Sequence, residues 1–256
     1  MTKFSIKQNV IIKSQIPPHG IVSSNPERTQ RIAEHFLQDL EQLPISWGVT
    51  VYLGKSKLND QTIFTASVPM GASGSAHAFH ELMAAGAKRI IRLGSNDVWV
   101  TKDDINSVVL ISEAKGLRGL GWDHGMDESV IDESIFGSAM LMETIESELG
   151  VKGIKYSKRV CFNVDDYHAY LYPDLAANSD RIKERLSFYD RFSPYCRDME
   201  TASLFLKANE FNVEAASVLQ NVVKQKAELP YEGLAGSKAK EFELQIGEIL
   251  LNCLNK

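Results

Sequence analysis

The most informative stretch of the chain reads Tyr195-Cys196-Arg197-Asp198-Met199-Glu200-Thr201-Ala202-Ser203-Leu204-Phe205-Leu206. Its apolar residues predict a helix with one buried face. Glu200 stands at the head of that face, where an ionised carboxylate is costly to bury unless polar groups surround it. Glu200 is therefore the first candidate for a functional residue.

On both sides of this stretch, strand patterns alternate with helix patterns. The β-rich runs 49–53 and 62–66 are separated by turn residues and predict a hairpin. Asn25 before Pro26 predicts a helix start, and this helix is expected to run on to Leu40. Further strands are expected at 21–23, 89–93, 107–111, 158–162 and 214–219, and further helices at about 75–86, 135–149 and 238–254. The alternation predicts a layered α/β fold, which we expect to be a single domain over residues 1–256.

The composition is that of a globular protein, with 44% hydrophobic and 24% charged residues among 256. The net charge of -5 and the lack of Lys/Arg-rich runs argue against nucleic acid as a partner, because phosphate backbones require clustered positive charge. No apolar run approaches membrane-spanning length and no signal peptide is evident, so we expect a cytoplasmic protein that does not bind membranes. Cys161, Cys196 and Cys253 are widely spaced, which predicts reduced, buried thiols.

Two long stretches, 115–134 and 169–179, show the weakest helix and strand patterns. We expect both to be loops, and loops of that length in a compact domain tend to be lids or binding loops.

Two loops that follow strands suit an anion, since open α/β sheets place ligands at strand ends. Residues 23–28 combine a helix start with the hydroxyl of Ser24 and the guanidinium of Arg28, and the alternative is a plain helix cap with a solvated arginine. Arg92 lies in an apolar strand just before the Gly94-Ser95 turn and could face the same anion. The alternative for Arg92 is a structural ion pair.

A third loop, 70–75, contains two glycines. They allow close approach of a ligand to the backbone, a pattern that also fits simple helix–strand packing. His77 and His80 are three residues apart on the following helix, but no third ligand accompanies them, so we expect no metal site.

Several motifs stand in one order along nearly the whole chain: Asn25-Pro26-x-Arg28, Ile32-Ala33-Glu34, Met70-Gly71, Glu81-Leu82, Arg89-Ile90-Ile91-Arg92-Leu93-Gly94-Ser95 and Asp198-Met199-Glu200-Thr201-Ala202. In order and approximate spacing they resemble the nucleoside phosphorylases that include the hexameric purine enzymes and uridine phosphorylase. The resemblance implies a three-layer α/β/α sandwich with a central mixed, partly barrel-like β-sheet flanked by helices. It also implies assembly as a homodimer or a trimer-of-dimers hexamer.

For the phosphate, the resemblance implies binding by Arg28, Arg92 and Ser95, to which the first loop adds Ser24. The implied reaction is displacement of the base by inorganic phosphate at the anomeric carbon, through an oxocarbenium-like state. Such catalysis consists mainly of positioning and charge stabilisation, so we expect no metal or organic cofactor.

For the nucleoside, the resemblance implies that Met199 and Glu200 contact the ribose, with the carboxylate accepting hydrogen bonds from the 2′ and 3′ hydroxyls. A sugar diol would make a part-buried carboxylate tolerable. Tyr167 matches an aromatic residue that stacks near the base, and Asn221 falls at the base end of the site.

The sequence departs from the family at positions of chemical importance. Ser24-Asn25 replaces Gly-Asp, Asp97 replaces a glycine, and residues 43–48 lack the arginine that a neighbouring subunit normally lends. No histidine precedes Pro18 to reach the ribose 5′ hydroxyl, and Asn221-Val222 replaces the aspartate that protonates a purine base.

Three functions therefore stay open. The retained Arg28, Arg92, Ser95 and Glu200 favour phosphorolysis of a purine or pyrimidine (deoxy)ribonucleoside in nucleoside salvage, with free base and (deoxy)ribose 1-phosphate as products. The missing subunit-borne arginine favours a nucleosidase, in which water replaces phosphate. The combined loss of acid, histidine and arginine favours nucleoside binding without turnover.

Overall fold

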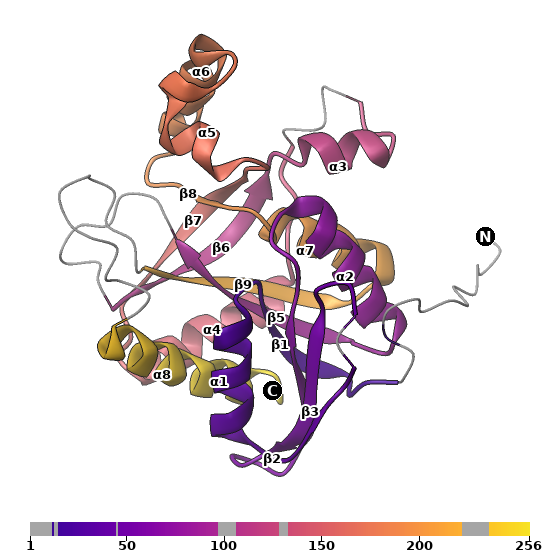
Figure 1. The fold of residues 1–256 in the computed structure, drawn as a ribbon. Helices are drawn as coiled ribbons and strands as arrows, with labels where there is room; N and C mark the ends of the chain where they lie inside the picture. The colour runs from indigo at the N-terminus through magenta and orange to yellow at the C-terminus, as the bar shows by residue number, and fades with distance from the viewer. Residues whose placement is uncertain (1–11, 13–14, 45, 97–105, 128–132, 222–235) are drawn as a thin grey trace.

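A mixed β-sheet forms the centre of the molecule. The computed structural model describes residue 12 and residues 15–44, 46–96, 106–127, 133–221 and 236–256. Within these residues the strands are β1 (His19–Ser23), β2 (Leu37–Gln42), β3 (Thr50–Ser56), β4 (Thr62–Ser67), β5 (Arg89–Asn96), β6 (Val108–Lys115), β7 (Tyr156–Asn163), β8 (Cys196–Asp198) and β9 (Glu214–Asn221). They pair in the order β2-β3-β4-β1-β5-β9-β6-β7-β8 (Figure 1). The pairs β2–β3, β3–β4 and β9–β6 are antiparallel and the others are parallel.

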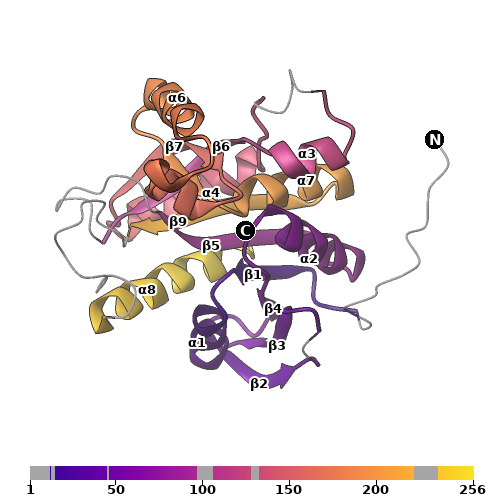
Figure 2. The same ribbon diagram turned by 45° about the horizontal axis from the view of Figure 1, so that its top comes forward.

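Helices cover both faces of the sheet. One face packs against α2 (Ala72–Ala84), α3 (Arg118–Asp123) and α7 (Thr201–Phe211), and the other against α1 (Pro26–Phe36), α4 (Ala139–Val151) and α8 (Ser237–Cys253). Figure 2 shows α1 and α8 on the opposite side of β1 and β5 from α2 and α7. The expected three-layer α/β/α arrangement is confirmed.

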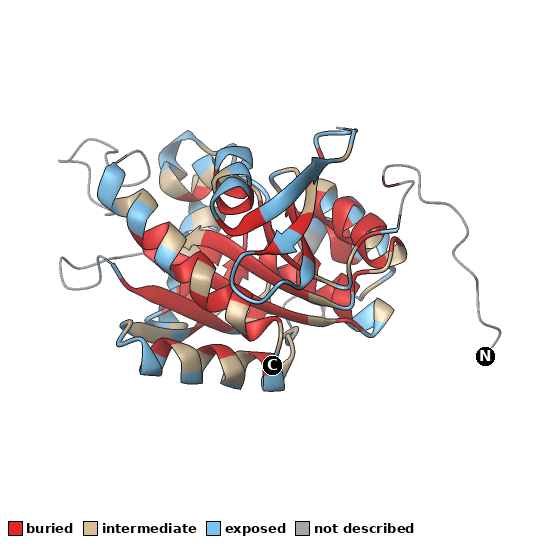
Figure 3. Ribbon diagram, turned by 90° about the horizontal axis from the view of Figure 1, so that it is seen from below, coloured by how far each residue is buried: buried red, intermediate tan, exposed pale blue. Residues whose placement is uncertain are grey.

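The near-continuous apolar runs of the central strands follow from this double coverage. Ile90 packs with the α2 and α7 layer and Ile91 with the α1 and α8 layer, and Val109 and Leu110 divide in the same way. Figure 3 shows the centre of the sheet largely buried, whereas the helices alternate buried and exposed residues; the edge strand β2 is exposed beyond Leu37.

The sheet does not stay flat. β5 and β8 are separated by β9, β6 and β7, which in a flat sheet would place them about 19 Å apart at the usual strand spacing. Yet Arg92 of β5 and Asp198 of β8 form an ion pair with 2.7 Å between Nη1 and Oδ2. The end of the sheet therefore curls back toward its middle, which accounts for the partly barrel-like character that we expected.

A third group of elements lies beyond the carboxyl end of β7. It consists of α5 (Tyr167–Leu171), η2 (Pro173–Leu175), α6 (Ser179–Tyr189) and η3 (Asp190–Phe192), which stand at the top of Figure 1. Phe162, Tyr170, Tyr189 and Tyr195 form its own aromatic cluster, in which the rings of Phe162 and Tyr189 stack with centroids 3.9 Å apart.

The structure confirms most of the expected elements and corrects three. The predicted hairpin is β3–β4. The helix expected to reach Leu40 ends at Phe36, because Leu37 adopts an extended backbone and begins strand β2, which pairs with β3. The expected loop at 169–179 is wrong, since it contains the end of α5, η2 and the start of α6, and residues 115–134 contain α3.

Two smaller expectations also have outcomes. The three cysteines are free and buried, as predicted. Among the described helices, none combines the length and the apolarity that crossing a bilayer requires.

Helix α4 allows a direct test of this layering. Ile145 is fully buried against the sheet and Val151 is 77% exposed at the helix end. We expect Ile145→Ala to lower the free energy of unfolding by about 2–5 kcal/mol, because it leaves a cavity in the core. Val151→Ala serves as the control and should change it by less than about 0.5 kcal/mol. Urea denaturation measures both, and equal losses would contradict the buried face assigned to α4.

Candidate functional site

A pocket of about 810 Å³ opens at the carboxyl ends of the strands. Its wall is built by residues that follow β1, β4 and β7, by two residues of β5, and by residues 197–200 at the end of β8. Seven of the eight residues predicted to bind ligands line this wall: Ser24, Arg28, Arg92, Ser95, Tyr167, Met199 and Glu200. Their roles stay predictions, but the structure brings them together.

The first loop places Arg28 through its helix cap. Asn25 accepts a hydrogen bond from the backbone N–H of Arg28 at 3.1 Å, and Pro26 occupies the first turn of α1. The cap that the sequence predicts is therefore present. Arg28, however, is only 2% exposed, so the alternative of a solvated arginine does not apply.

The guanidinium of Arg28 is almost fully engaged. Its Nε donates to Glu243 Oε2 at 2.7 Å, its Nη2 to Ser95 Oγ at 2.9 Å, and its Nη1 to the Leu93 carbonyl at 3.2 Å and to Ser23 Oγ at 3.4 Å. These contacts use four of the five N–H donors of an arginine, so the described residues leave one for a ligand. Burial lowers the pKa of Arg28, while Glu243 opposes this shift.

Glu243 of α8 is the buried partner that the sequence did not reveal. Glu243 is 3% exposed and also forms an ion pair with Arg31, whose Nη2 lies 2.7 Å from Glu243 Oε1. The sequence does contain a feature that could have identified Glu243. This carboxylate falls in the apolar stripe of α8 that contains Phe242, Ile246 and Leu250. A carboxylate in such a stripe needs a partner.

Arg92 is enclosed by two carboxylates. Its Nη1 lies 2.7 Å from Asp198 Oδ2, and its Nη2 makes a short contact with Glu200 Oε2. Burial lowers the pKa of Arg92, but the two carboxylates outweigh this and raise it above the ordinary value. The structural ion pair proposed as an alternative is thus present, while the buried Nε has no partner among the described residues.

The carboxylate of Glu200 has three protein partners. It is the N-cap residue of α7 and accepts hydrogen bonds from the N–H of Gly71 at 2.9 Å and from Ser24 Oγ at 3.4 Å, in addition to Arg92. Burial raises the pKa of Glu200, with Arg92 and the Gly71 N–H acting in the opposite direction. The polar groups that make its burial tolerable are therefore already supplied by the protein.

The backbone conformation of Gly71 accounts for one of the two glycines in the third loop. Its backbone has a φ of 95°, a region that residues with a Cβ rarely adopt. This conformation goes with the hydrogen bond from its N–H to Glu200, so this glycine approaches a protein carboxylate.

Residues of α5 and β8 form the other end of the pocket. Tyr167 and His168 lie at the start of α5 with their rings in a T-shaped contact, and Asp166 caps this helix by accepting the N–H groups of His168 and Ala169. Arg197 lines the same end and is 3% exposed, with its Nη1 3.4 Å from the Tyr170 carbonyl. Sequence reasoning missed Arg197 because the three-residue strand β8 showed no pattern of its own.

Asn221 does not line this pocket. Its side-chain amide donates to Ser107 Oγ and accepts from Asn96, both at 2.8 Å, at the end of the β5–β9 ladder. Since both ends of the amide are engaged there, we do not include Asn221 among the proposed ligand contacts. Asp97 and Val222, which differ from the family pattern, lie outside the described residues, as do residues 1–11.

No group of three or more His, Cys, Asp or Glu side chains in the described part of the chain is arranged to hold a metal ion. The pocket wall presents guanidinium, carboxylate, hydroxyl, amide, imidazole and thioether groups.

Comparison with known proteins places the chain in a family. Residues 18–229 match the family model of the phosphorylase superfamily. A segment of 76 residues is 40% identical to a DeoD-type purine nucleoside phosphorylase of Shewanella oneidensis, covering 29% of this chain and 31% of that relative. The chain thus matches less than a third of that relative's length.

Two crystal structures of uridine phosphorylase from Vibrio fischeri share the fold. The complex with 6-hydroxy-1-naphthoic acid aligns with a TM-score of 0.73 at 24% identity, over 94% of this chain and 92% of that one. A second structure aligns with a TM-score of 0.75 at 22% identity, over 98% and 99%. At these identities the likeness concerns the fold alone.

The buried partner of Arg28 generates a stability prediction. Glu243→Gln should lower the free energy of unfolding by about 3–5 kcal/mol, because it removes the charge that compensates a buried guanidinium. Glu248→Gln, on the same helix, is the control; its pair with Lys152 is exposed, so we expect a change below about 1 kcal/mol. Chemical denaturation measures both variants. Indistinguishable losses would refute the structural role of Glu243.

Proposed function

This chain belongs to the phosphorylase superfamily, and we propose that it cleaves the N-glycosidic bond of a nucleoside with inorganic phosphate. The products are the free base and (deoxy)ribose 1-phosphate. The observation that supports this most is the meeting of Arg28, Arg92, Ser95 and Glu200 on the wall of one pocket.

The phosphate would lie against the groups at the β1 and β5 ends. One N–H of Arg28 and the hydroxyl hydrogen of Ser95 are not engaged by the described residues. Ser95 Oγ already accepts from Arg28, so its own hydrogen is free to be donated to an anion oxygen. These donors suit the attacking phosphate.

The ribose would lie against Met199 and Glu200. When the 2′ and 3′ hydroxyls donate to the carboxylate, they replace part of its contact with Arg92, and the guanidinium can turn its charge toward the phosphate. A phosphate oxygen then attacks the anomeric carbon as the bond to the base breaks, with the bonding electrons leaving on the base. The protein contributes positioning and a charge environment for the oxocarbenium-like state.

Hydrolysis is the second candidate, and the charge balance of the pocket favours it. Arg28 is paired with Glu243, and Arg92 with Asp198 and Glu200, so phosphate must compete with carboxylates for both cations. Water carries no charge and meets no such competition. Binding without turnover is the third reading.

Product analysis separates the three functions. Purified protein is incubated with purine and pyrimidine nucleosides, with and without phosphate, and the sugar product is identified. We expect ribose 1-phosphate, formed only when phosphate is present. Free ribose in both reactions would establish hydrolysis, and binding without any product would establish the third reading.

Ser95→Ala tests the phosphate end within the same assay. The variant removes one hydroxyl donor to an anion, so the KM for phosphate should rise about tenfold or more while the KM for nucleoside changes little. Ser112→Ala is the control, because its hydroxyl bonds to the Arg159 carbonyl on β7 and does not line the pocket. An unchanged phosphate KM in Ser95→Ala would remove Ser95 from the phosphate site.

The pKa of Glu200 predicts how nucleoside binding depends on pH. Burial raises this pKa above the ordinary glutamate value, and the ribose diol needs the ionised carboxylate as acceptor. Lowering the pH through the raised pKa therefore protonates Glu200 and weakens binding by about tenfold per pH unit. Calorimetric titration from neutral to acidic pH measures this. Glu200→Gln should bind weakly with no such dependence over the same range, and an unaltered affinity in that variant would refute the ribose contact.

A further inference from the structure

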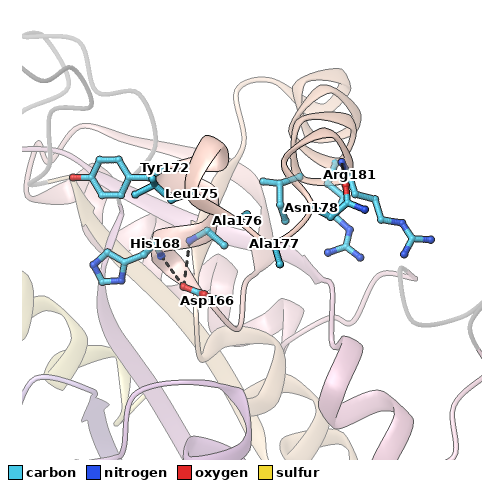
Figure 4. A pocket seen from close by; sticks show the side chains of 11 residues that line it. Asp166, His168, Tyr172, Leu175, Ala176, Ala177, Asn178 and Arg181 are labelled. Atoms are coloured by element: carbon cyan, nitrogen blue, oxygen red, sulfur yellow. Dashed lines mark hydrogen bonds between the residues drawn. The ribbon is translucent and has the colours of Figure 1, made fainter.

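A second pocket, of about 430 Å³, lies between α5, η2 and α6. It shares Asp166 and His168 with the first pocket, and neither Glu200 nor any residue of the phosphate end lines it. Figure 4 shows His168 and Tyr172 on one side of this pocket and Arg181 of α6 on the other. The two pockets therefore adjoin at the end where Tyr167 lies, across a rim whose two residues are exposed.

Two arginines supply the charge of the second pocket. Arg181 and Arg185 are four residues apart on α6, so their side chains lie on one face of the helix. Neither forms an ion pair with a described residue. Asp174 forms an ion pair with Lys183, with 2.6 Å between Oδ1 and Nζ. Asp166 accepts hydrogen bonds from two backbone N–H groups of α5.

Two weak electrostatic effects act on these arginines, of which Arg181 is exposed to water and Arg185 is half-buried. Like charges four residues apart repel, and Arg181 lies in the first turn of α6, where the helix dipole disfavours a cation. A bound anion would relieve both effects. Two guanidinium groups also suit a carboxylate or phosphate, which they can hold with paired hydrogen bonds.

We propose that this pocket receives a carboxylate-bearing substituent on the base of a nucleoside whose sugar lies in the first pocket. The inference rests on the proposed function and names the substrate class: nucleosides with an acidic base modification. The substituent would leave the base beside Tyr167, cross the rim at Asp166 and His168, and end at Arg181 and Arg185.

The side chains between the rim and the arginines fit such a linker. Ala169, Ala176 and Ala177 line the pocket and leave room, while Leu175 and Tyr172 offer apolar surface to a short carbon chain. The bond that is cleaved is the same N-glycosidic bond, so no additional chemical step is involved.

The test compares three nucleosides that differ in the charge of the substituent on the base. Adenosine carrying a 1,2-dicarboxyethyl group on N6 is titrated calorimetrically into the full-length protein, alongside its neutral dimethyl ester and unmodified adenosine. We expect the acid to bind about tenfold or more tightly than the ester, and the same preference in kcat/KM where turnover occurs. The double variant R181A/R185A should lose this preference and keep its affinity for adenosine.

Lys183→Ala is the matched control, because it removes a cation from the same helix without altering the pocket wall. It should retain the preference for the acid. Equal binding of acid and ester, or a preference that survives in R181A/R185A, would overturn this inference while leaving the proposed function intact.

Two further outcomes separate the sources of the anion and the two proposals. Succinate that binds at Arg181 and Arg185 as tightly as the acid nucleoside, without competing with it, would show an independent anion site and overturn the inference. If none of the three nucleosides binds, the inference fails, whereas the proposed function fails only if the pyrimidine nucleosides of the product assay are not cleaved either.

Discussion

The buried contact of Arg92 with Asp198 and Glu200 connects the middle of the sheet to its edge. Arg92 belongs to β5, whereas both carboxylates come from β8 and the start of α7, so the contact holds the curled end of the sheet over the strands it faces. Asp198 also accepts the N–H groups of Glu200 and Thr201, which fixes the first turn of α7. A charged group buried to this extent needs every partner, since removing one leaves an uncompensated charge in the interior. The wall of the pocket and the closure of the sheet therefore depend on the same few atoms.

Arg28 and Arg92 of the first pocket each pair with carboxylates, and under the proposed reaction this would limit how an anion enters. Arg28 and Arg31 share Glu243, while Arg92 is shared by Asp198 and Glu200. For the proposed reaction we therefore expect a ligand to exchange places with these carboxylates rather than to enter an open cationic cavity. Under the proposed reaction, the diol that draws Glu200 away from Arg92 also increases the charge available to phosphate, so the two substrates assist each other. A phosphate alone faces the competition of the carboxylates in full.

The sequence predicted those features of the fold that depend on residues close together in the chain. The cap at Asn25, the β3–β4 hairpin and the buried strands β5 and β9 each follow from a few adjacent residues. The change from α1 to β2 at Leu37 did not, because pairing with β3 overrides the helix pattern. Among the seven residues on the pocket wall, local patterns singled out Ser24, Arg28, Arg92 and Glu200, and the family resemblance added Ser95, Tyr167 and Met199. The buried partner of Arg28 was not predicted. Glu243 is 215 residues from Arg28, and no spacing rule connects them.

Gly94 shows how closely the backbone of β5 is tied to this charge arrangement. A Cβ at this position would clash with Nη1 of Arg92 and with the side chain of Leu219 on the neighbouring strand. The guanidinium therefore folds back over its own strand, and only a residue without a side chain permits this. The strand then continues to Ser95, whose hydroxyl meets Arg28. The glycine of the Arg-Leu-Gly-Ser turn thus makes room for the guanidinium of Arg92, and both Arg28 and Arg92 line the same pocket.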